Sequence, residues 1–207
     1  MKLAPWLLMI ALGLANGCGS SGDDDDDDDT SADATVGGID SGGDPVVVLE
    51  TTMGNMVVEL AQSDMPITTA NFLSYVDTGF YDGTLVHRVD DGWVIQGGGY
   101  TSGLTPKAPG APIVLETSPN VSHVHGAISM ARTSDPDSAT SQWFIVDWPA
   151  TGTPPQPGQL DGQYAAFGIV IEGLDVLAAI SEVATTSAGG LDDVPVTEVV
   201  MTSAHRQ

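Results

Sequence analysis

The sequence predicts a mainly β protein whose strands form an antiparallel barrel accompanied by two α-helices. Short runs of β-branched and aromatic residues recur along the chain, and Gly, Pro, Asn and Asp separate them. Only two stretches show the 3.6-residue hydrophobic period of a helix. Hydrophobic residues make up 42% of the 207 residues, which is enough to fill a core.

Three segments differ in composition. Residues 1–17 predict a signal peptide, because a single lysine precedes an apolar run that is short for a membrane span. Residues 18–44 are rich in Gly, Ser, Thr and Asp, with seven successive aspartates, and predict a disordered acidic tether. The folded domain is expected over residues 45–207.

Cys18 is the only cysteine in the chain, so no intramolecular disulfide can form. The residues before it, Leu14-Ala15-Asn16-Gly17, resemble a bacterial lipobox, which implies that Cys18 becomes the lipidated first residue. An ordinary signal peptide with an incidental Cys18 is the alternative. The expected location is therefore the bacterial cell envelope, as a membrane-anchored lipoprotein that faces the periplasm or the cell exterior.

The chain is strongly acidic, with five Lys and Arg against 28 Asp and Glu and a formal net charge of -23. Nucleic-acid binding is excluded, because neutralising phosphates needs clustered basic residues. The same argument leaves a lipid anchor as the only expected contact with a membrane. The charge also favours a soluble monomer.

The folded domain begins with a predicted β-hairpin, residues 46–50 and 56–60, with Gly54 and Asn55 as turn residues. Further strands are expected at residues 85–89 and 93–96, the second ending at three glycines. A short strand at 113–116, a proline-rich surface loop at 148–159 and a closing strand at 194–201 complete the β pattern.

Two helices are expected. The first follows Pro66, with Asp64 able to cap it and Gly79 ending it. The second covers residues 173–183 and places Leu174, Leu177, Ile180 and Val183 on one face.

The most unusual residue is Arg88, a cation inside an apolar, strand-like run of a chain that has few cations. An exposed strand arginine is the simpler interpretation. The order His87-Arg88-x-x-x-x-Gly92-Trp93-x-x-Gln96-Gly97-Gly98, however, resembles the cyclophilin signature. Residues 126–132, 138–145 and 160–168 resemble further segments of that family in the same order. The resemblance implies a closed eight-stranded antiparallel β-barrel capped by two α-helices, and peptidyl-prolyl cis-trans isomerase activity.

The resemblance also implies a role for each site residue. Arg88 would be the catalytic hydrogen-bond donor, and Gln96 would hold the substrate carbonyl. Ala131 and Arg132 would offer backbone groups to the peptide, Gln142 would support the site, and Tyr164 would replace a polar contact that the family makes with His. The expected pocket walls are Trp93, Val94, Phe144 and Leu160; taken alone, such residues are more often part of a core. His87 is expected to be structural.

Other chemistry finds little support in the sequence. His123 and His125 have the spacing of metal ligands, but no further His or Cys completes a site, and no cofactor is implied. No Gly-x-Ser-x-Gly elbow marks a serine nucleophile. The expected substrates are proline-containing segments of exported proteins. A catalytically weak proline-peptide-binding or holdase module, and a purely structural envelope protein, are the alternatives.

Overall fold

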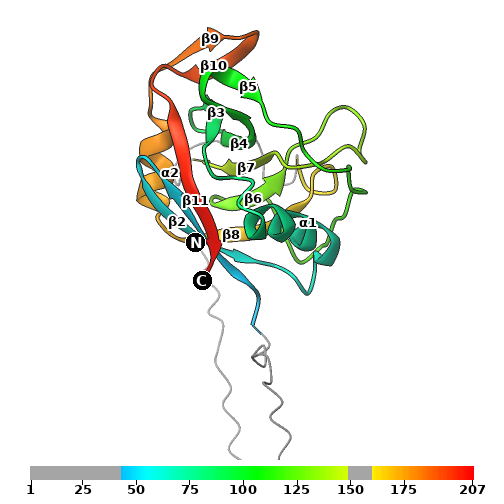
Figure 1. Ribbon diagram of the computed structural model, residues 1–207. Helices are drawn as coiled ribbons and strands as arrows, with labels where there is room; N and C mark the ends of the chain where they lie inside the picture. Colours follow the sequence, from blue (N-terminus) through cyan, green and yellow to red (C-terminus); the bar gives the residue numbers. More distant parts are fainter. Residues whose placement is uncertain (1–42, 149–159) are drawn as a thin grey trace, which may run out of the picture. The chain divides into compact units, whose positions relative to one another are not determined.

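Figure 1 shows the computed structural model, which describes residues 43–148 and 160–207. The predicted signal peptide, Cys18, nearly all of the tether and residues 149–159 of the proline-rich loop lie outside the described residues. Two α-helices, one short 3-10 helix and eleven strands make up the described part. In chain order these are β1 (Val46–Thr51), β2 (Gly54–Leu60), α1 (Pro66–Asp77), β3 (Thr84–Asp90), β4 (Val94–Thr101), η1 (Ser102–Leu104), β5 (Thr105–Pro106), β6 (Ala127–Met130), β7 (Trp143–Val146), β8 (Ala166–Glu172), α2 (Leu174–Ser181), β9 (Thr185–Ala188), β10 (Leu191–Pro195) and β11 (Val199–Arg206).

Eight strands close into a barrel. Their order around the sheet is β3-β11-β1-β2-β8-β6-β7-β4, and β4 also pairs with β3. Every pairing is antiparallel, so the predicted closed eight-stranded antiparallel barrel is confirmed. The short β5 extends the sheet beyond β4, and β9 and β10 form a separate two-stranded sheet. This last hairpin was not predicted from the sequence: Val194 was expected in the closing strand but belongs to β10.

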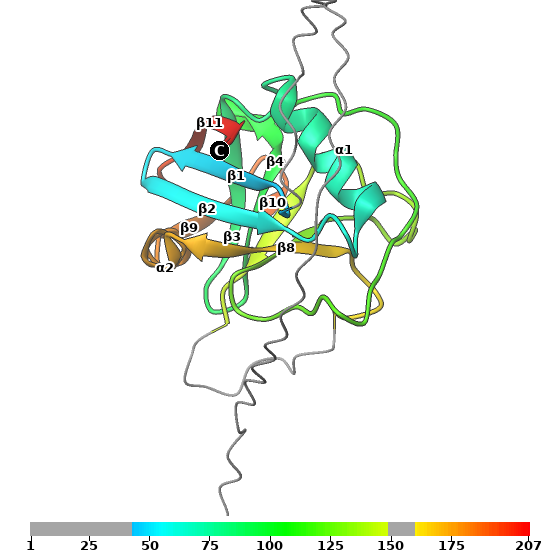
Figure 2. The same ribbon diagram turned by 90° about the horizontal axis from the view of Figure 1, so that it is seen from below.

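The two helices lie on opposite sides of the barrel in both views (Figures 1 and 2). Phe72 of α1 and Leu177 and Ile180 of α2 are fully buried in the core that the strands enclose. Leu174 is 40% exposed, contrary to the expectation that it shares the buried face of α2. It lies at the first position of the helix, directly after the N-cap residue Gly173.

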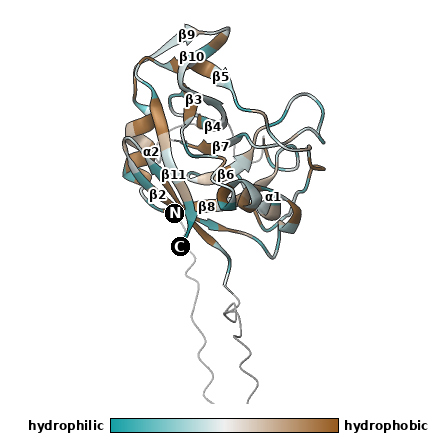
Figure 3. Ribbon diagram, viewed as in Figure 1, coloured by the Kyte–Doolittle hydropathy of each residue, from teal (hydrophilic) through white to brown (hydrophobic). Residues whose placement is uncertain are grey.

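Many hydrophobic side chains of the strands are buried in the core of the barrel. Figure 3 shows that β11 changes from hydrophobic at its start to hydrophilic at its end. Val199 and Met201 are buried in the core, whereas His205 and Arg206 are exposed. The alternation within β1 and β2 also places every second residue inside, as the period of a strand requires.

The first helix is capped by a distant residue. Its N-cap position is Met65, which makes no side-chain hydrogen bond. Glu116 instead accepts hydrogen bonds from the backbone N–H groups of Ile67 (3.2 Å) and Thr68 (2.8 Å). The expectation that Asp64 caps the helix is therefore wrong, because its carboxylate accepts from Ser118 and Asn120.

Three local expectations also need correction. The hairpin turn is Thr52–Met53, and Gly54 already pairs with Thr51 in the ladder. The three glycines after Gln96 continue β4 instead of ending it. The segment 113–116 forms no strand, only a single bridge between Ile113 and Ala139.

Candidate active site

Nine of the ten predicted binding and catalytic residues line one pocket of about 160 Å³. They come from β3, the turn between β3 and β4, β4, β7, the residues after β6 and the segment that leads into β8. The tenth, Gln142, lies beside it and lines a second pocket of about 210 Å³ that shares Gln96, Ala131 and Arg132 with the first. The nine are Arg88, Trp93, Val94, Gln96, Ala131, Arg132, Phe144, Leu160 and Tyr164.

Arg88 lies in β3, and its side chain is 35% exposed. Its Nη2 donates a hydrogen bond to Oδ2 of Asp90 at 2.7 Å. Its Nε is 3.7 Å from Oδ2 of Asp193 in β10. Neither carboxylate was singled out in the sequence. Asp90 could have been found, because residues two apart in a strand point to the same face.

The apolar walls form a hydrophobic cluster of their own, separate from the barrel core. Val94 and Phe144 are 3% and 6% exposed, so they are buried within this cluster and also line the pocket. The ring of Tyr164 packs edge-on against Phe144 at 5.7 Å between centroids. Trp148, which was not among the predicted site residues, is buried next to Trp93 with 6.0 Å between ring centroids. The remaining partly buried members of the cluster are Trp93, Ala131, Leu160 and Tyr164.

Two glutamines connect the two pockets. Gln96 lies opposite Arg88 in the β3–β4 ladder, and its Nε2 donates to Oε1 of Gln142 at 3.0 Å. The side chain of Gln142 passes so close to Gly99 that a Cβ there would lie 2.6 Å from it. Glycine at this position therefore allows Gln142 to reach Gln96.

Arg132 contributes its side chain as well as its backbone to the site. Its Nε donates to the carbonyl of Gln163 at 2.9 Å, and its Nη1 donates to the carbonyl of Thr133 at 2.8 Å. The guanidinium lies over the ring of Tyr164, 4.4 Å from the centroid. The backbone N–H of Ala131 already donates to Gln142, which leaves its carbonyl as the group that can meet a peptide.

A network of three polar side chains, of which His123 and Ser129 are buried, holds the wall that carries Leu160 and Tyr164. Asp161 accepts hydrogen bonds from the backbone N–H of His123 (2.9 Å) and from its Nδ1 (2.7 Å). Nε2 of His123 lies 3.0 Å from Oγ of Ser129. The three groups are arranged as in a hydrolase triad, but Ser129 is 0% exposed, so no substrate can reach its hydroxyl.

The protonation states of His123 and Asp161 in this network follow from their surroundings. Burial lowers the pKa of His123, although the neighbouring Asp161 opposes that shift. Burial alone would raise the pKa of Asp161, but hydrogen bonds from His123 bring it below the ordinary value. The imidazole is therefore neutral at pH 7, with its proton on Nδ1 for Asp161 and its Nε2 accepting from Ser129.

His87, the neighbour of Arg88, has its side chain inside the protein and is 4% exposed. Its ring packs against Tyr100 with 4.7 Å between centroids. Burial lowers its pKa from 6.5 to about 4, so the ring is neutral at pH 7. This environment agrees with the structural role expected for His87.

Across residues 43–148 and 160–207, no group of three or more His, Cys, Asp or Glu side chains could hold a metal ion. In the same ranges, no helix is both long and apolar enough to cross a membrane.

Comparisons with known proteins agree on one family. A family model described as cyclophilin type peptidyl-prolyl cis-trans isomerase/CLD matches residues 46–206. Peptidyl-prolyl cis-trans isomerase A of Dickeya dadantii (strain 3937) is 42% identical over 158 residues, which cover 76% of this chain and 82% of that protein. A peptidyl-prolyl cis-trans isomerase of Streptomyces antibioticus is 44% identical over 159 residues, 76% of this chain and 96% of that protein.

The fold has a counterpart among solved structures. A cyclophilin type peptidyl-prolyl cis-trans isomerase of Cryptosporidium parvum, crystallised in the presence of the dipeptide Ala-Pro, superposes with a TM-score of 0.64 at 26% identity. The match covers 78% of this chain and 98% of that chain. With a family model over nearly all of the described domain and bacterial relatives at 42% and 44% identity, the chain belongs to the cyclophilin type peptidyl-prolyl cis-trans isomerases.

Proposed function

We propose that this isomerase accelerates the cis-trans isomerisation of X-Pro bonds in exported proteins, and that Arg88 is the hydrogen-bond donor in an apolar proline pocket. The observation that carries the proposal is the shared pocket itself. A half-exposed guanidinium lies at one side of a cavity whose other walls include Phe144, Val94 and Leu160. A cation beside an apolar cavity of this size suits a small ring next to a polar amide.

The chemical task is rotation about a bond with partial double-bond character. The barrier is about 18–20 kcal/mol, and no covalent bond forms or breaks. A catalyst must therefore bind the twisted amide more tightly than either planar form. The apolar walls would hold the prolyl ring and exclude water, which strengthens the remaining hydrogen bonds.

Arg88 supplies the interaction that favours the twisted state. As the amide twists, the prolyl nitrogen becomes pyramidal and begins to accept a hydrogen bond. Within the described residues, Nη1 of Arg88 makes no hydrogen bond, so its donors remain for the substrate. Asp90 and Asp193 contact Nη2 and Nε and would fix the plane of the guanidinium. The role resembles that of donors aimed at charge that develops only in a transition state.

Gln96 would hold a backbone carbonyl of the substrate next to the amide bond that rotates. One hydrogen of its Nε2 is used by Gln142, and an amide nitrogen carries two. The second hydrogen is left for a substrate carbonyl. Because Gln96 faces Arg88 across the β3–β4 ladder, both side chains lie on the same face of the barrel.

The exported location rests on the sequence. A signal-like segment at residues 1–17, Cys18 directly after it and the acidic tether at residues 18–44 suggest a lipid-anchored domain on a leash in the cell envelope. Mass spectrometry of the mature N-terminus tests this part by itself. A lipidated Cys18 as the first residue is expected, and an unmodified Cys18 or cleavage elsewhere would contradict it.

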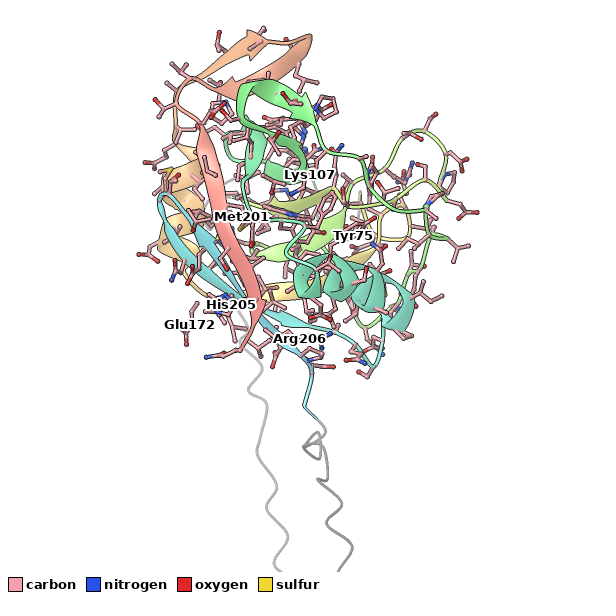
Figure 4. The ribbon with its side chains drawn as sticks, in the orientation of Figure 1. Tyr75, Lys107, Glu172, Met201, His205 and Arg206 are labelled. Atoms are coloured by element: carbon pink, nitrogen blue, oxygen red, sulfur yellow. The ribbon has the colours of Figure 1, made fainter. Side chains whose placement is uncertain are left out.

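The catalytic part is tested by exchange NMR on a proline peptide with the wild type, Arg88→Ala and Arg206→Gln. Arg206 lies at the end of β11 (Figure 4), outside both pockets, and forms a bidentate ion pair with Asp77. Arg88→Ala is expected to lower kcat/KM at least about tenfold, the effect of losing one transition-state donor, while the control keeps its activity. Wild-type protein that binds the peptide without accelerating exchange would instead indicate a proline-peptide-binding module.

A further inference from the structure

The second pocket of the site differs from the rest of this acidic molecule. Its volume is about 210 Å³, and it opens beside the proline pocket through residues that both share. No carboxylate lines it. Its polar lining consists of one guanidinium, two amides and three hydroxyl side chains, which belong to Arg132, Gln96, Gln142, Thr133, Ser138 and Thr140.

Arg132 differs from Arg88 in its partners. The guanidinium of Arg88 is in contact with two carboxylates, Asp90 and Asp193. The guanidinium of Arg132 makes its hydrogen bonds only to the neutral carbonyls of Gln163 and Thr133. Its positive charge is therefore not compensated by any carboxylate of the described residues.

The acidic residues that follow Arg132 in the chain are occupied elsewhere. Asp135 accepts a hydrogen bond from the backbone N–H of Asp137. Asp137 accepts one from the backbone N–H of Leu115. Neither carboxylate lines either pocket. Neither carboxylate forms an ion pair with the guanidinium of Arg132.

Arg132 is also held in one orientation with donors to spare. A guanidinium has five N–H donors, and the two hydrogen bonds to carbonyls use two of them, which leaves three. Nη2 makes no hydrogen bond to any described residue. The ring of Tyr164 supports the guanidinium plane from one side at 4.4 Å. A fixed, uncompensated cation with free donors is a suitable receptor for a carboxylate.

We propose that the second pocket selects substrates in which an acidic side chain, Asp or Glu, lies close in sequence to the isomerised proline, and that Arg132 binds its carboxylate. This inference rests on the proposed function, because it assigns a substrate class to the same site. Such a site would also affect how acidic peptides approach this acidic protein. The net charge of -23 disfavours the approach of acidic peptides, most strongly at low salt, and Arg132 offsets that repulsion where the peptide must dock.

The test uses pairs of peptides with a single proline that differ by one residue, Glu or Gln, at each of three positions before and two after the proline. The full-length protein is assayed by exchange NMR at physiological ionic strength. At one position or more, kcat/KM for the Glu peptide is expected to exceed that for the Gln peptide about fivefold, which corresponds to roughly 1 kcal/mol.

The variants assign the preference to one side chain. Arg132→Gln is expected to bring the ratio to about one, and Arg132→Glu to invert it. Arg132→Lys keeps the charge but loses the fork and is expected to give an intermediate ratio. Arg206→Gln changes the net charge equally outside both pockets and is expected to keep the wild-type ratio. One-dimensional NMR spectra check that each variant is folded.

Two results would overturn the inference: a wild-type ratio of one at every position, or a preference that survives in Arg132→Gln. Chemical-shift titrations with the same peptides give dissociation constants alongside the rates. If no peptide is isomerised, the proposed function fails, but an Arg132-dependent preference in the dissociation constants would still support the subsite. If no peptide binds, the subsite fails as well.

Discussion

Nε of Arg88 lies 3.7 Å from Oδ2 of Asp193, so a residue of the barrel contacts a residue of a hairpin outside it. Asp193 has a φ of 58°, a left-handed conformation that few residues other than glycine adopt. The β9–β10 hairpin therefore holds Asp193 in an unusual backbone conformation at the place where it meets the proposed donor.

Asp193→Asn is expected to lower kcat/KM about two- to fivefold, because an exposed ion pair contributes roughly 0.4–1 kcal/mol to the orientation of the guanidinium. The free energy of unfolding should change by less than about 0.5 kcal/mol, as for most surface substitutions. Asp192→Asn is the matched control, since Asp192 accepts from Ser187 within the same hairpin. Equal activity of the two variants would show that Asp193 does not orient the guanidinium of Arg88.

His87 predicts a pH-dependent stability. Its pKa is about 4 in the folded protein and 6.5 when unperturbed, so between these values the unfolded chain binds one more proton at this residue. The free energy of unfolding should therefore fall as pH drops from about 6.5 to about 4, with His87 contributing about 3 kcal/mol. Urea denaturation of wild type and His87→Gln across this range isolates the contribution, because the carboxylates titrate in both. Parallel pH curves would contradict it.

The contact between Asp161 and His123 predicts a change confined to one pocket wall. In Asp161→Ala the segment that carries Leu160 and Tyr164 loses two hydrogen bonds, each worth roughly 0.5–1.5 kcal/mol. Amide hydrogen exchange at residues 160–164 should accelerate, and KM should rise more than kcat falls. Glu172→Ala, an exposed change in β8 (Figure 4), serves as the control. Unchanged exchange in this segment would show that other contacts hold the wall.

Gly98 and Gly103 form a pair that separates backbone strain from crowding. Both have positive φ, 83° and 71°. A Cβ on Gly98 would lie 2.8 Å from the carbonyl oxygen of Ser141, whereas a Cβ on Gly103 would have no heavy atom within 4 Å. Gly103→Ala is expected to cost about 1 kcal/mol of stability. Gly98→Ala should cost at least about 2 kcal/mol more, as overpacking does. Chemical denaturation measures both, and equal costs would mean that the strand adjusts to the new methyl group.

The sequence predicted well what depends on neighbours in the chain. The alternation of residues 46–60 predicts a hairpin, and the resemblance of residues 87–98 to one ordered motif placed Arg88, Trp93, Val94 and Gln96 at one pocket. The same reasoning placed Leu177 and Ile180 on the buried face of α2. These features follow from short periods and from an ordered motif.

Features that depend on distant partners were not predictable in this way. Glu116 caps α1 across 49 positions, and nothing in its own surroundings distinguishes it from Asp64, the nearer acid. The β9–β10 hairpin is short and largely polar, with a weak strand pattern, so the contact of Asp193 with Arg88 left no signal. The uncompensated charge of Arg132 likewise depends on the folded structure, because it arises from the lack of a carboxylate partner among the described residues.

The position of β11 has a consequence for biosynthesis. It is the last strand in sequence order among the described residues, yet it lies between β1 and β3 and completes the ring. During synthesis from the N-terminus, the early strands must wait for it, and so the barrel cannot close until the ribosome has released residues up to Arg206. A growing chain that still lacks residues 199–206 therefore leaves the edges of β1 and β3 without the strand that joins them.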